Sequence, residues 1–573
     1  MKRSLNTLSG LLAGALLAGC AGIGAGPGPA ATPKADPASA ALPNVELSPD
    51  VLYDLLLGEI AGQRGQLEVA AASLNRAARK TRDPRLVERA TLVGLYAKRP
   101  QETLETARLW TEIAPDNLEA REALASVLMD LGRPDEAQQH LERIVDKAAG
   151  ADLTQAYLRI AAALGRQQNR VAALEIMERL VQRHPDKPEA HFAMAHLAVR
   201  VGNLEQANDV IDRALRLRPD WEEAALFKAR VLISQKDPQK VIAFSEKFLD
   251  DHPRVINFRT NYARFLVDLK QWDKARDQFK RVVAIAPRDA DALYAVGLLA
   301  MQTNDLDEAE KYLMRTLEVQ PDNDQVRLYL GQIAEQRKLY AEAGQWFREI
   351  QPGPHHFEAQ ARLGLVIARQ GDVAGARSHL HKLSPENEPQ RVQQVLTEEQ
   401  ILREARQYDE ALRVLSKTIK QLPENTDLLY ARALVAEKLN DLELHEHDLR
   451  MILSKEPKNA HALNALGYTL ADRTTRYDEA LKLIEQALAL KPDDPFIMDS
   501  MGWVKYRLGQ YEESVKYLRA ALDKRPDAEI SAHLGEVLWV MGDRAGAESV
   551  WMRALRDSPD SEVLLGIIKK FKP

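Results

Sequence analysis

One period of 34 residues runs through most of this sequence and restricts what the chain can fold into. Only 28 of the 573 residues are proline, so a regular spacing of prolines cannot be accidental. A chain with a fixed period of this length folds as a solenoid of repeated units rather than as several unrelated domains. The prolines on this register are Pro185, Pro219, Pro253, Pro287, Pro321, Pro389, Pro423 and Pro457, with His355 in the one missed place, and Pro492, Pro526 and Pro559 follow within one residue of it.

Small residues recur at the same pitch, 12 and 24 positions before a proline. Ala161 and Ala173 precede Pro185 in this way. Between these marks, apolar residues recur at spacings of three and four, so each unit is predicted to be two amphipathic helices and the fold class is all-α. The proline ends the second helix because it cannot donate the backbone hydrogen bond. The small residues are expected where the paired helices cross. Four short polar residues are predicted to cap second helices: Asn203, Asp273, Asp305 and Asp478.

This pattern resembles the tetratricopeptide repeat, and the resemblance extends from about Ser48 to the C-terminus. It implies a superhelical solenoid of antiparallel helix pairs over residues 48–560, with roughly fourteen or fifteen units. The earliest units keep the pattern weakly, and residues 86–115 fit it poorly. Residues 561–573 are interpreted as a capping helix for the last repeat. A polar stretch with two prolines, Pro385 and Pro389, is interpreted as a candidate hinge near residues 384–400.

The N-terminus has the pattern of an export signal. Lys2 and Arg3 precede a short apolar run over residues 8–17, which favours a cleaved signal peptide, residues 1–19, over a membrane span. The run ends in Leu-Ala-Gly-Cys at Cys20, the only cysteine of the chain, and this resembles the lipobox of bacterial lipoproteins. The resemblance implies acylation of Cys20. The alternative is an ordinary signal peptide with a chance cysteine.

The residues after Cys20 are predicted to tether a folded body to a membrane. Residues 20–47 are rich in Ala, Pro and Gly and carry too few large apolar residues to fold, so they are interpreted as a disordered tether. By the sorting rule of the lipoproteins that the chain resembles, Ala21 after the cysteine implies the periplasmic face of the outer membrane rather than the inner membrane.

The composition and motifs do not favour catalysis or nucleic-acid binding. The chain has 78 basic and 84 acidic residues, a net charge of -6, so no basic excess recommends nucleic acid. No Gly-rich phosphate loop, Gly-x-Ser-x-Gly elbow or His-Glu-x-x-His motif occurs. Close histidine pairs such as His355 with His356 face different directions on a helix, so no metal site, cofactor or enzyme activity is predicted. Glu399 and His445 occupy positions where small residues are expected. Each is interpreted either as a buried titratable site or, more simply, as a place where the repeats pack irregularly.

The candidate binding surface is the concave face, which the first helix of each unit lines in tetratricopeptide arrays. The repeat register places mostly aromatic residues there in the C-terminal units, a composition typical of peptide-binding grooves. For Trp503 and Trp539 the alternative is packing between adjacent repeats. The candidate groove residues are Tyr430, Asn464, Tyr468, Phe496, Asp499, Trp503, Tyr506 and Trp539.

These features predict a protein-binding scaffold that works without catalysis. Two hypotheses stay open for its role: an adaptor that brings a soluble periplasmic protease to its substrates, and a structural scaffold of an envelope secretion system for exopolysaccharide or pili. The lipobox, the tether and the length of the solenoid resemble the outer-membrane tetratricopeptide lipoproteins of the LbcA type, which partner a carboxyl-terminal processing protease. That resemblance implies a periplasmic serine protease as partner and cell-wall hydrolases as its substrates. The segments 462–468 and 499–503 are similar to envelope tetratricopeptide lipoproteins generally.

Overall fold

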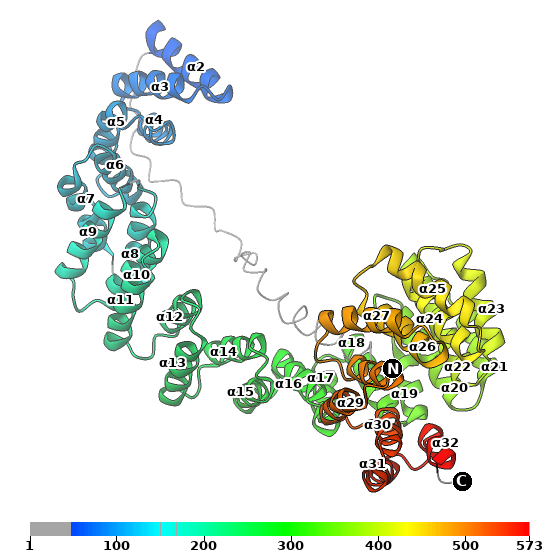
Figure 1. The fold of residues 1–573 in the computed structure, drawn as a ribbon. Coiled ribbons are helices and arrows are strands. Elements are labelled where there is room, and N and C mark those ends of the chain that lie inside the picture. The colour runs from blue at the N-terminus through cyan, green and yellow to red at the C-terminus, as the bar shows by residue number, and fades with distance from the viewer. Residues whose placement is uncertain (1–46, 149–150, 168, 572–573) are drawn as a thin grey trace. The chain divides into compact units, whose positions relative to one another are not determined.

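The computed structural model of the chain describes residues 47–148, 151–167 and 169–571. The proposed signal peptide, Cys20 and nearly all of the tether lie outside the described residues. Helices α2 to α32 follow one another through the described part, which contains no strand, so the all-α prediction is confirmed (Figure 1). The chain divides into two compact units, Met1–Tyr312 and Leu313–Pro573, and each is described separately below.

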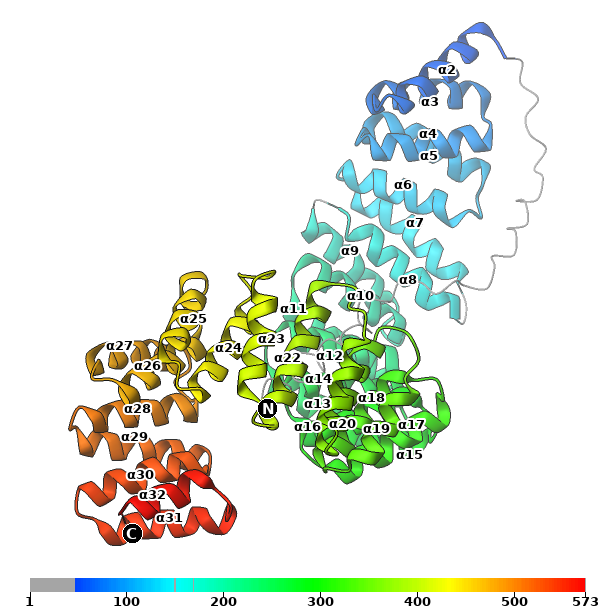
Figure 2. The same cartoon turned by 90° about the vertical axis from the view of Figure 1, so that its right-hand side faces the viewer.

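The helices of the first unit come in pairs joined by short turns, and Figure 2 shows the pairs α2 to α9 stacked side by side. The division between the units falls within the last helix of the set, α17. The helices are α2 (Pro49–Gln63), α3 (Leu67–Thr81), α4 (Pro84–Tyr96), α5 (Pro100–Ile113), α6 (Leu118–Asp130), α7 (Pro134–Lys147), α8 (Ala151–Leu164), α9 (Arg170–Arg183), α10 (Pro188–Val201), α11 (Leu204–Leu217), α12 (Glu222–Ser234), α13 (Pro238–Asp251), α14 (Ile256–Asp268), α15 (Trp272–Ile285), α16 (Ala290–Gln302) and α17 (Leu306–Val319).

The second unit continues the same alternation to the end of the described chain. Its helices are α18 (Asp324–Gln336), α19 (Tyr340–Glu349), α20 (His356–Arg369), α21 (Val373–His381), α22 (Glu388–Glu404), α23 (Tyr408–Ile419), α24 (Thr426–Lys438), α25 (Leu442–Lys455), α26 (Ala460–Arg473), α27 (Tyr477–Leu490), α28 (Pro495–Arg507), α29 (Tyr511–Lys524), α30 (Ala528–Val540), α31 (Arg544–Asp557) and α32 (Glu562–Phe571).

Even-numbered helices are the first helices of the repeats and odd-numbered helices are the second. From α20 to α30, each first helix packs on its own second helix and also on the first helix of a neighbouring repeat, as α26 does with α27 and α28. The apolar core therefore runs along the stack from one repeat to the next, and α24, α26 and α28 share one buried cluster that includes Leu429, Leu466 and Val504.

The small residues lie where the two helices of a pair cross, as predicted. A Cβ atom added to Gly535 of α30 would lie 2.0 Å from Nε1 of Trp551 on α31. The same atom on Gly331 would lie 2.3 Å from the ring of Phe347. A larger residue at either position would push the backbones apart, because buried side chains are already in close contact.

The prolines have a second role that the spacing did not predict. In several repeats the side chain six positions after the proline lies on the next first helix and bonds the carbonyl oxygen of that proline. Nη2 of Arg259 donates to the carbonyl of Pro253 at 2.9 Å, and Nε2 of His191 lies 3.0 Å from that of Pro185. This bond satisfies an acceptor in the turn between repeats that would otherwise lack a helical partner.

The capping predictions were half right. Asn203 caps α11 by accepting a hydrogen bond from the backbone N–H of Gln206 at 3.1 Å, and Asp305 accepts from that of Glu308 at 3.2 Å. Asp273 and Asp478 do not cap: they lie inside the first turns of α15 and α27, whose N-cap residues form no side-chain cap. An acidic residue in the first turn still favours the helix through the helix dipole.

The candidate hinge near 384–400 contains a short connector and an unusually long helix. α21 has 9 residues and α22 has 17, with Asn387 capping α22 through the backbone N–H of Gln390. Ile401 of α22 packs with Leu365 and Leu380 in one buried cluster. The division between the compact units lies elsewhere, between Tyr312 and Leu313. Bending at 384–400 stays a prediction.

Candidate protein-binding grooves

A groove in unit 2 is lined by the first helices α26, α28 and α30 together with α32. It encloses about 580 Å³. Trp503 and Tyr506 of α28, two of the candidate groove residues, line it, and their rings lie 5.1 Å apart between centroids. The remaining lining residues are Asp472, Arg507, Ala532, His533, Glu536, Glu562, Val563, Gly566, Ile567 and Lys570.

Three first helices meet at the floor of this groove through His533, which no sequence pattern singled out. Its Nδ1 atom lies 2.9 Å from Oδ1 of Asp499, and its Nε2 atom lies 3.3 Å from the hydroxyl of Tyr468. The indole of Trp503 stacks on the imidazole at 4.3 Å. Asp499 and His533 are 34 residues apart, so the repeat pitch itself could have revealed that these two groups share a face.

The pKa of His533 is raised despite its burial. Burial alone disfavours the imidazolium, but the charge and hydrogen bond of Asp499, with further attraction from Glu529 and Asp472, outweigh it. The pKa of Tyr468 is also raised, first by burial and then by nearby carboxylates. Burial and Glu536 raise the pKa of Tyr506 to about 12. The carboxylates of Asp499 and Glu536 therefore act directly on side chains of the groove.

The structure brings together four of the predicted groove residues, Tyr468, Asp499, Trp503 and Tyr506. Trp503 is only 6% exposed and its Nε1 atom donates to Asp472 at 3.2 Å, which is the geometry of packing between repeats. Asp499 is likewise buried. Of the four, Tyr468 and Tyr506 are partly exposed, so they remain the better candidates for direct contact with a partner.

The other four predicted groove residues lie apart from this network. Trp539 stacks on Trp551 at 5.8 Å near the end of the array. The ring of Phe496 is 39% exposed and carries the guanidinium of Arg525 at 4.9 Å. Two residues remain: Tyr430 packs half-buried against the core, and Asn464 has a buried Oδ1 atom that accepts no hydrogen bond from the described residues. Partner binding by any of the eight residues stays a prediction.

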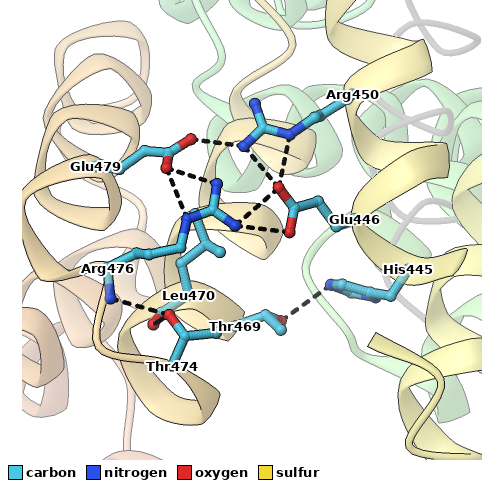
Figure 3. Close-up of polar contacts among 8 residues, drawn as sticks. All are labelled: His445, Glu446, Arg450, Thr469, Leu470, Thr474, Arg476 and Glu479. Carbon is cyan, nitrogen blue, oxygen red and sulfur yellow. Dashed lines mark hydrogen bonds and ion pairs between the residues drawn. The ribbon is translucent and has the colours of Figure 1, made fainter. Parts of the chain in front are cut away.

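His445 and Glu399 have structural surroundings. His445 is buried, with Nδ1 lying 2.8 Å from the carbonyl of Ala433 and Nε2 lying 3.0 Å from Oγ1 of Thr469, so it joins α24, α25 and α26 (Figure 3). Burial raises the pKa of Glu399, although Arg403 opposes this and donates to its carboxylate at 2.7 Å. Neither residue lines the groove.

The second helices α25 and α27 share a network of four charges beside His445. Arg450 and Arg476 each contact both Glu446 and Glu479, at 2.6 to 2.9 Å (Figure 3). Beside this network, Thr474 accepts a hydrogen bond from the backbone N–H of Arg476 at 3.0 Å (Figure 3). This partly exposed network joins neighbouring repeats and contributes little stability.

A second groove lies in unit 1, on the first helices α4, α6 and α8, and the sequence reasoning missed it. It encloses about 1080 Å³. Tyr96 and Leu92, in its wall, are 78% and 49% exposed, which is unusual for such large apolar groups. Residues 86–115 fit the repeat poorly, so the register could not be assigned there. The spacing of four between Leu92 and Tyr96 was the available signal.

Among the described residues, no group of three or more His, Cys, Asp and Glu side chains could hold a metal ion. The same part of the chain contains no helix that is both long enough and apolar enough to cross a membrane.

Residues 260–316, 294–355, 400–444, 446–495 and 500–562 match one tetratricopeptide-repeat family, and residues 166–231 match another. The chain is 36% identical over 489 residues to the TPR repeat-containing protein PA4667 of Pseudomonas aeruginosa, covering 85% of this chain and 82% of that protein. It is 23% identical over 306 residues to the cellulose synthase 2 operon protein C of Komagataeibacter xylinus, covering 52% of this chain and 22% of that protein.

Among solved structures, yeast Tom70 is 14% identical and aligns with a TM-score of 0.34, covering 90% of this chain and 99% of that one. The repeat matches and the 36% identity to a TPR protein, which extends over most of both chains, agree. This chain belongs to the tetratricopeptide-repeat protein family.

Proposed function

We propose that this protein is a non-catalytic scaffold, anchored through acylated Cys20 to the periplasmic face of the outer membrane. In this role it is an adaptor for a periplasmic serine protease of the carboxyl-terminal processing type and promotes degradation of peptidoglycan hydrolases. One observation carries the adaptor role: among the described residues, separate grooves lie on the first helices of both compact units.

Two grooves let one chain hold a protease and its substrate at the same time. Linking two binding events on one molecule makes the second intramolecular and raises the local concentration to about the millimolar range. The two grooves also differ in chemistry. Both grooves carry carboxylates, but the groove of unit 1 also offers exposed apolar groups such as Tyr96, whereas the aromatic rings of the unit 2 groove are buried or half-buried. Unlike partners can therefore occupy them without competing.

The test is capture of the mature lipoprotein from its own envelope, followed by identification of the proteins retained. A carboxyl-terminal processing protease is expected in the complex. Deleting the gene should make peptidoglycan endopeptidases accumulate to the level seen when the protease gene is deleted. Unchanged hydrolase levels, with no protease in the captured complex, would refute the adaptor role.

The two-groove arrangement is tested by exposed residues whose replacement should leave the fold intact. Leu92→Ala with Tyr96→Ala in unit 1 is expected to release one partner and retain the other, with a loss of about 1 kcal/mol or more per residue. Val171→Ala on the second helix α9 is the matched control, since Val171 is 66% exposed and lies outside both grooves. If the variant that carries Leu92→Ala and Tyr96→Ala lost both partners while the Val171→Ala control kept both, the two partners could not bind at separate sites.

The similarity to cellulose synthase 2 operon protein C favours a second candidate function, a structural scaffold of an exopolysaccharide secretion system. In that case the captured complex should contain integral membrane components in place of a soluble protease. Pilus assembly is the related alternative and makes the same prediction.

A further inference from the structure

We propose that the groove of unit 2 binds a partner through a lysine or arginine side chain, which enters between α28, α30 and α32 and pairs with Glu536. This inference rests on the proposed scaffold function and names the chemistry of one partner. The groove is a surface of mixed aromatic and acidic character, and three features of it point to a cationic side chain.

The first feature is the charge of the groove. Among the residues that line it, the carboxylates of Asp472, Glu536 and Glu562 stand against the cations Arg507 and Lys570. His533 offsets Asp499. Arg507 pairs with Asp472, whose carboxylate lies 3.8 Å from Nη1 and whose backbone carbonyl accepts a hydrogen bond at 2.7 Å, and it also donates to the hydroxyl of Tyr477 at 3.0 Å. The lining therefore carries one carboxylate more than it carries cations, and this small acidic excess favours a basic ligand.

The second feature is a lysine of the chain itself that already occupies such a site. The carboxylate of Glu536 is buried, with 8% of its side chain exposed, and it accepts a hydrogen bond from Nζ of Lys570 at 2.9 Å. The Lys570 side chain is 58% exposed, so it approaches from the solvent side at the end of α32. A buried carboxylate needs a partner, but nothing restricts that partner to Lys570.

Exchange of one ammonium group for another at Glu536 leaves the number of ion pairs unchanged. A partner lysine therefore competes with Lys570 instead of adding to it. The consequence is specific to this geometry: removing Lys570 should strengthen the binding of a cationic ligand, whereas removing the charge of Glu536 should weaken it.

The third feature is the aromatic lining. The partly exposed ring of Tyr506 lies beside Glu536 and its hydroxyl donates to Glu536 at 3.3 Å, with the ring of the buried Trp503 5.1 Å from it. The aliphatic part of a lysine or arginine side chain packs well on such rings while its charge reaches the carboxylate. This arrangement favours a long basic side chain over a bare cation.

The experiment uses the full chain in detergent and two fluorescent peptides that differ only in one residue, a central lysine or the uncharged norleucine. Fluorescence anisotropy should show binding of the lysine peptide, with the norleucine peptide about tenfold weaker or more, equivalent to about 1.4 kcal/mol. Glu536→Gln should weaken the lysine peptide at least several-fold. Lys570→Met should strengthen it at least several-fold.

Lys524→Met is the matched control, because Lys524 pairs with Asp493 at 2.6 Å on an exposed surface outside the groove. It should leave binding unchanged. Circular dichroism of each variant verifies that the helices persist, and Glu536→Gln retains the shape of the side chain. Equal binding of the two peptides, or weaker binding by Lys570→Met, would overturn the inference.

The outcome is independent of the adaptor proposal. If the lysine peptide binds as expected while envelope capture yields no protease, the adaptor proposal fails and the basic-ligand groove stands. If the protease is captured equally by the unaltered chain and by Glu536→Gln, and the lysine peptide does not bind, the groove inference fails and the adaptor proposal stands.

Discussion

The turn between the two helices of a repeat imposes a left-handed backbone conformation on residues that seldom adopt it. Lys236, Lys270 and Lys338 recur at the 34-residue pitch with φ of 58°, 58° and 61°, and Gly202 and Gly542 take the same role elsewhere. A residue with a Cβ atom costs about 1–2 kcal/mol in this conformation, and glycine avoids most of that cost.

Lys338→Gly is therefore expected to stabilise unit 2 by about 0.5–1 kcal/mol, the steric gain less the extra entropy of glycine in the unfolded chain. Urea denaturation followed by circular dichroism measures the change. Lys516→Gly, in the interior of α29 on an exposed face, should instead destabilise by a similar amount. A loss of stability from Lys338→Gly would show that the strain is relieved in some other way.

His533 makes the end of the array sensitive to pH. Its folded pKa is raised above the usual value near 6.5, so its contribution to stability is fully present below about pH 6.5 and is lost as pH rises through the folded value. The groups that face it are Asp499, Tyr468, Asp472 and, from its own helix, Glu529.

Thermal melts of the full chain between about pH 6 and pH 9 should show a falling midpoint as pH increases. His533→Gln and Asp499→Asn should each flatten this decline, because each removes one member of the ion pair. A midpoint that rises with pH in the unaltered chain, or an equal decline in His533→Gln, would assign the pH dependence to other groups.

At the scale of residues, the sequence predicted which helix face a side chain belongs to better than it predicted which side chains that residue would contact. The repeat register assigned Trp503 and Tyr506 to one face, and both line the groove of unit 2; the pitch that relates them is a property of the backbone. It could not reveal that Trp503 would be buried against His533, since that depends on how far α28 and α30 approach each other. Asp273 and Asp478 were misassigned for a related reason: a shift of two residues separates a cap from a first turn.

At the scale of helices, the pairing of each repeat depends on close contact at a single small residue. Gly535→Ala would place a Cβ atom 2.0 Å from Nε1 of Trp551, a ring that is 1% exposed and cannot move aside. Overpacking of this kind typically costs about 1–3 kcal/mol.

Urea denaturation should show that loss for Gly535→Ala, whereas Gly566→Ala on α32 should cause none, because no atom lies within 4 Å of a Cβ atom added there. Trp551→Leu should recover part of the loss when combined with Gly535→Ala, giving a favourable interaction energy in the double-mutant cycle. Additive effects of the two substitutions would place the clash elsewhere.

The same reasoning explains which helices the sequence could not assign. From residue 161 onward, alanine and glycine at fixed intervals mark the crossings. In residues 86–115 the crossing of α4 and α5 uses Gly94 against Thr103, and the following turn has no proline on the main register. The fold of those repeats is ordinary although their sequence pattern is weak, which is why the groove of unit 1 was not predicted.

At the scale of the whole molecule, the proposed function depends on where the array is held. A single acyl chain gives only marginal membrane binding, at about 0.8 kcal/mol per buried methylene, so stable attachment needs several chains on one residue. Cys20 is the only cysteine of the sequence and therefore the only residue at which lipobox processing can attach them.

Cys20→Ser is expected to abolish incorporation of a fatty acid analogue during metabolic labelling and to move the protein out of the detergent-soluble membrane fraction. Ser39→Ala, in the proposed tether, is the matched control and should label normally. Under the proposed adaptor role, in which the chain holds a protease near the envelope, the unlabelled Cys20→Ser protein should still bind its partners in solution but should no longer bring the protease to the membrane. Fatty acid labelling that persisted in Cys20→Ser would refute the lipid anchor at this residue. Degradation of the hydrolases that persisted without the anchor would show that partner binding, rather than membrane localisation, drives that degradation.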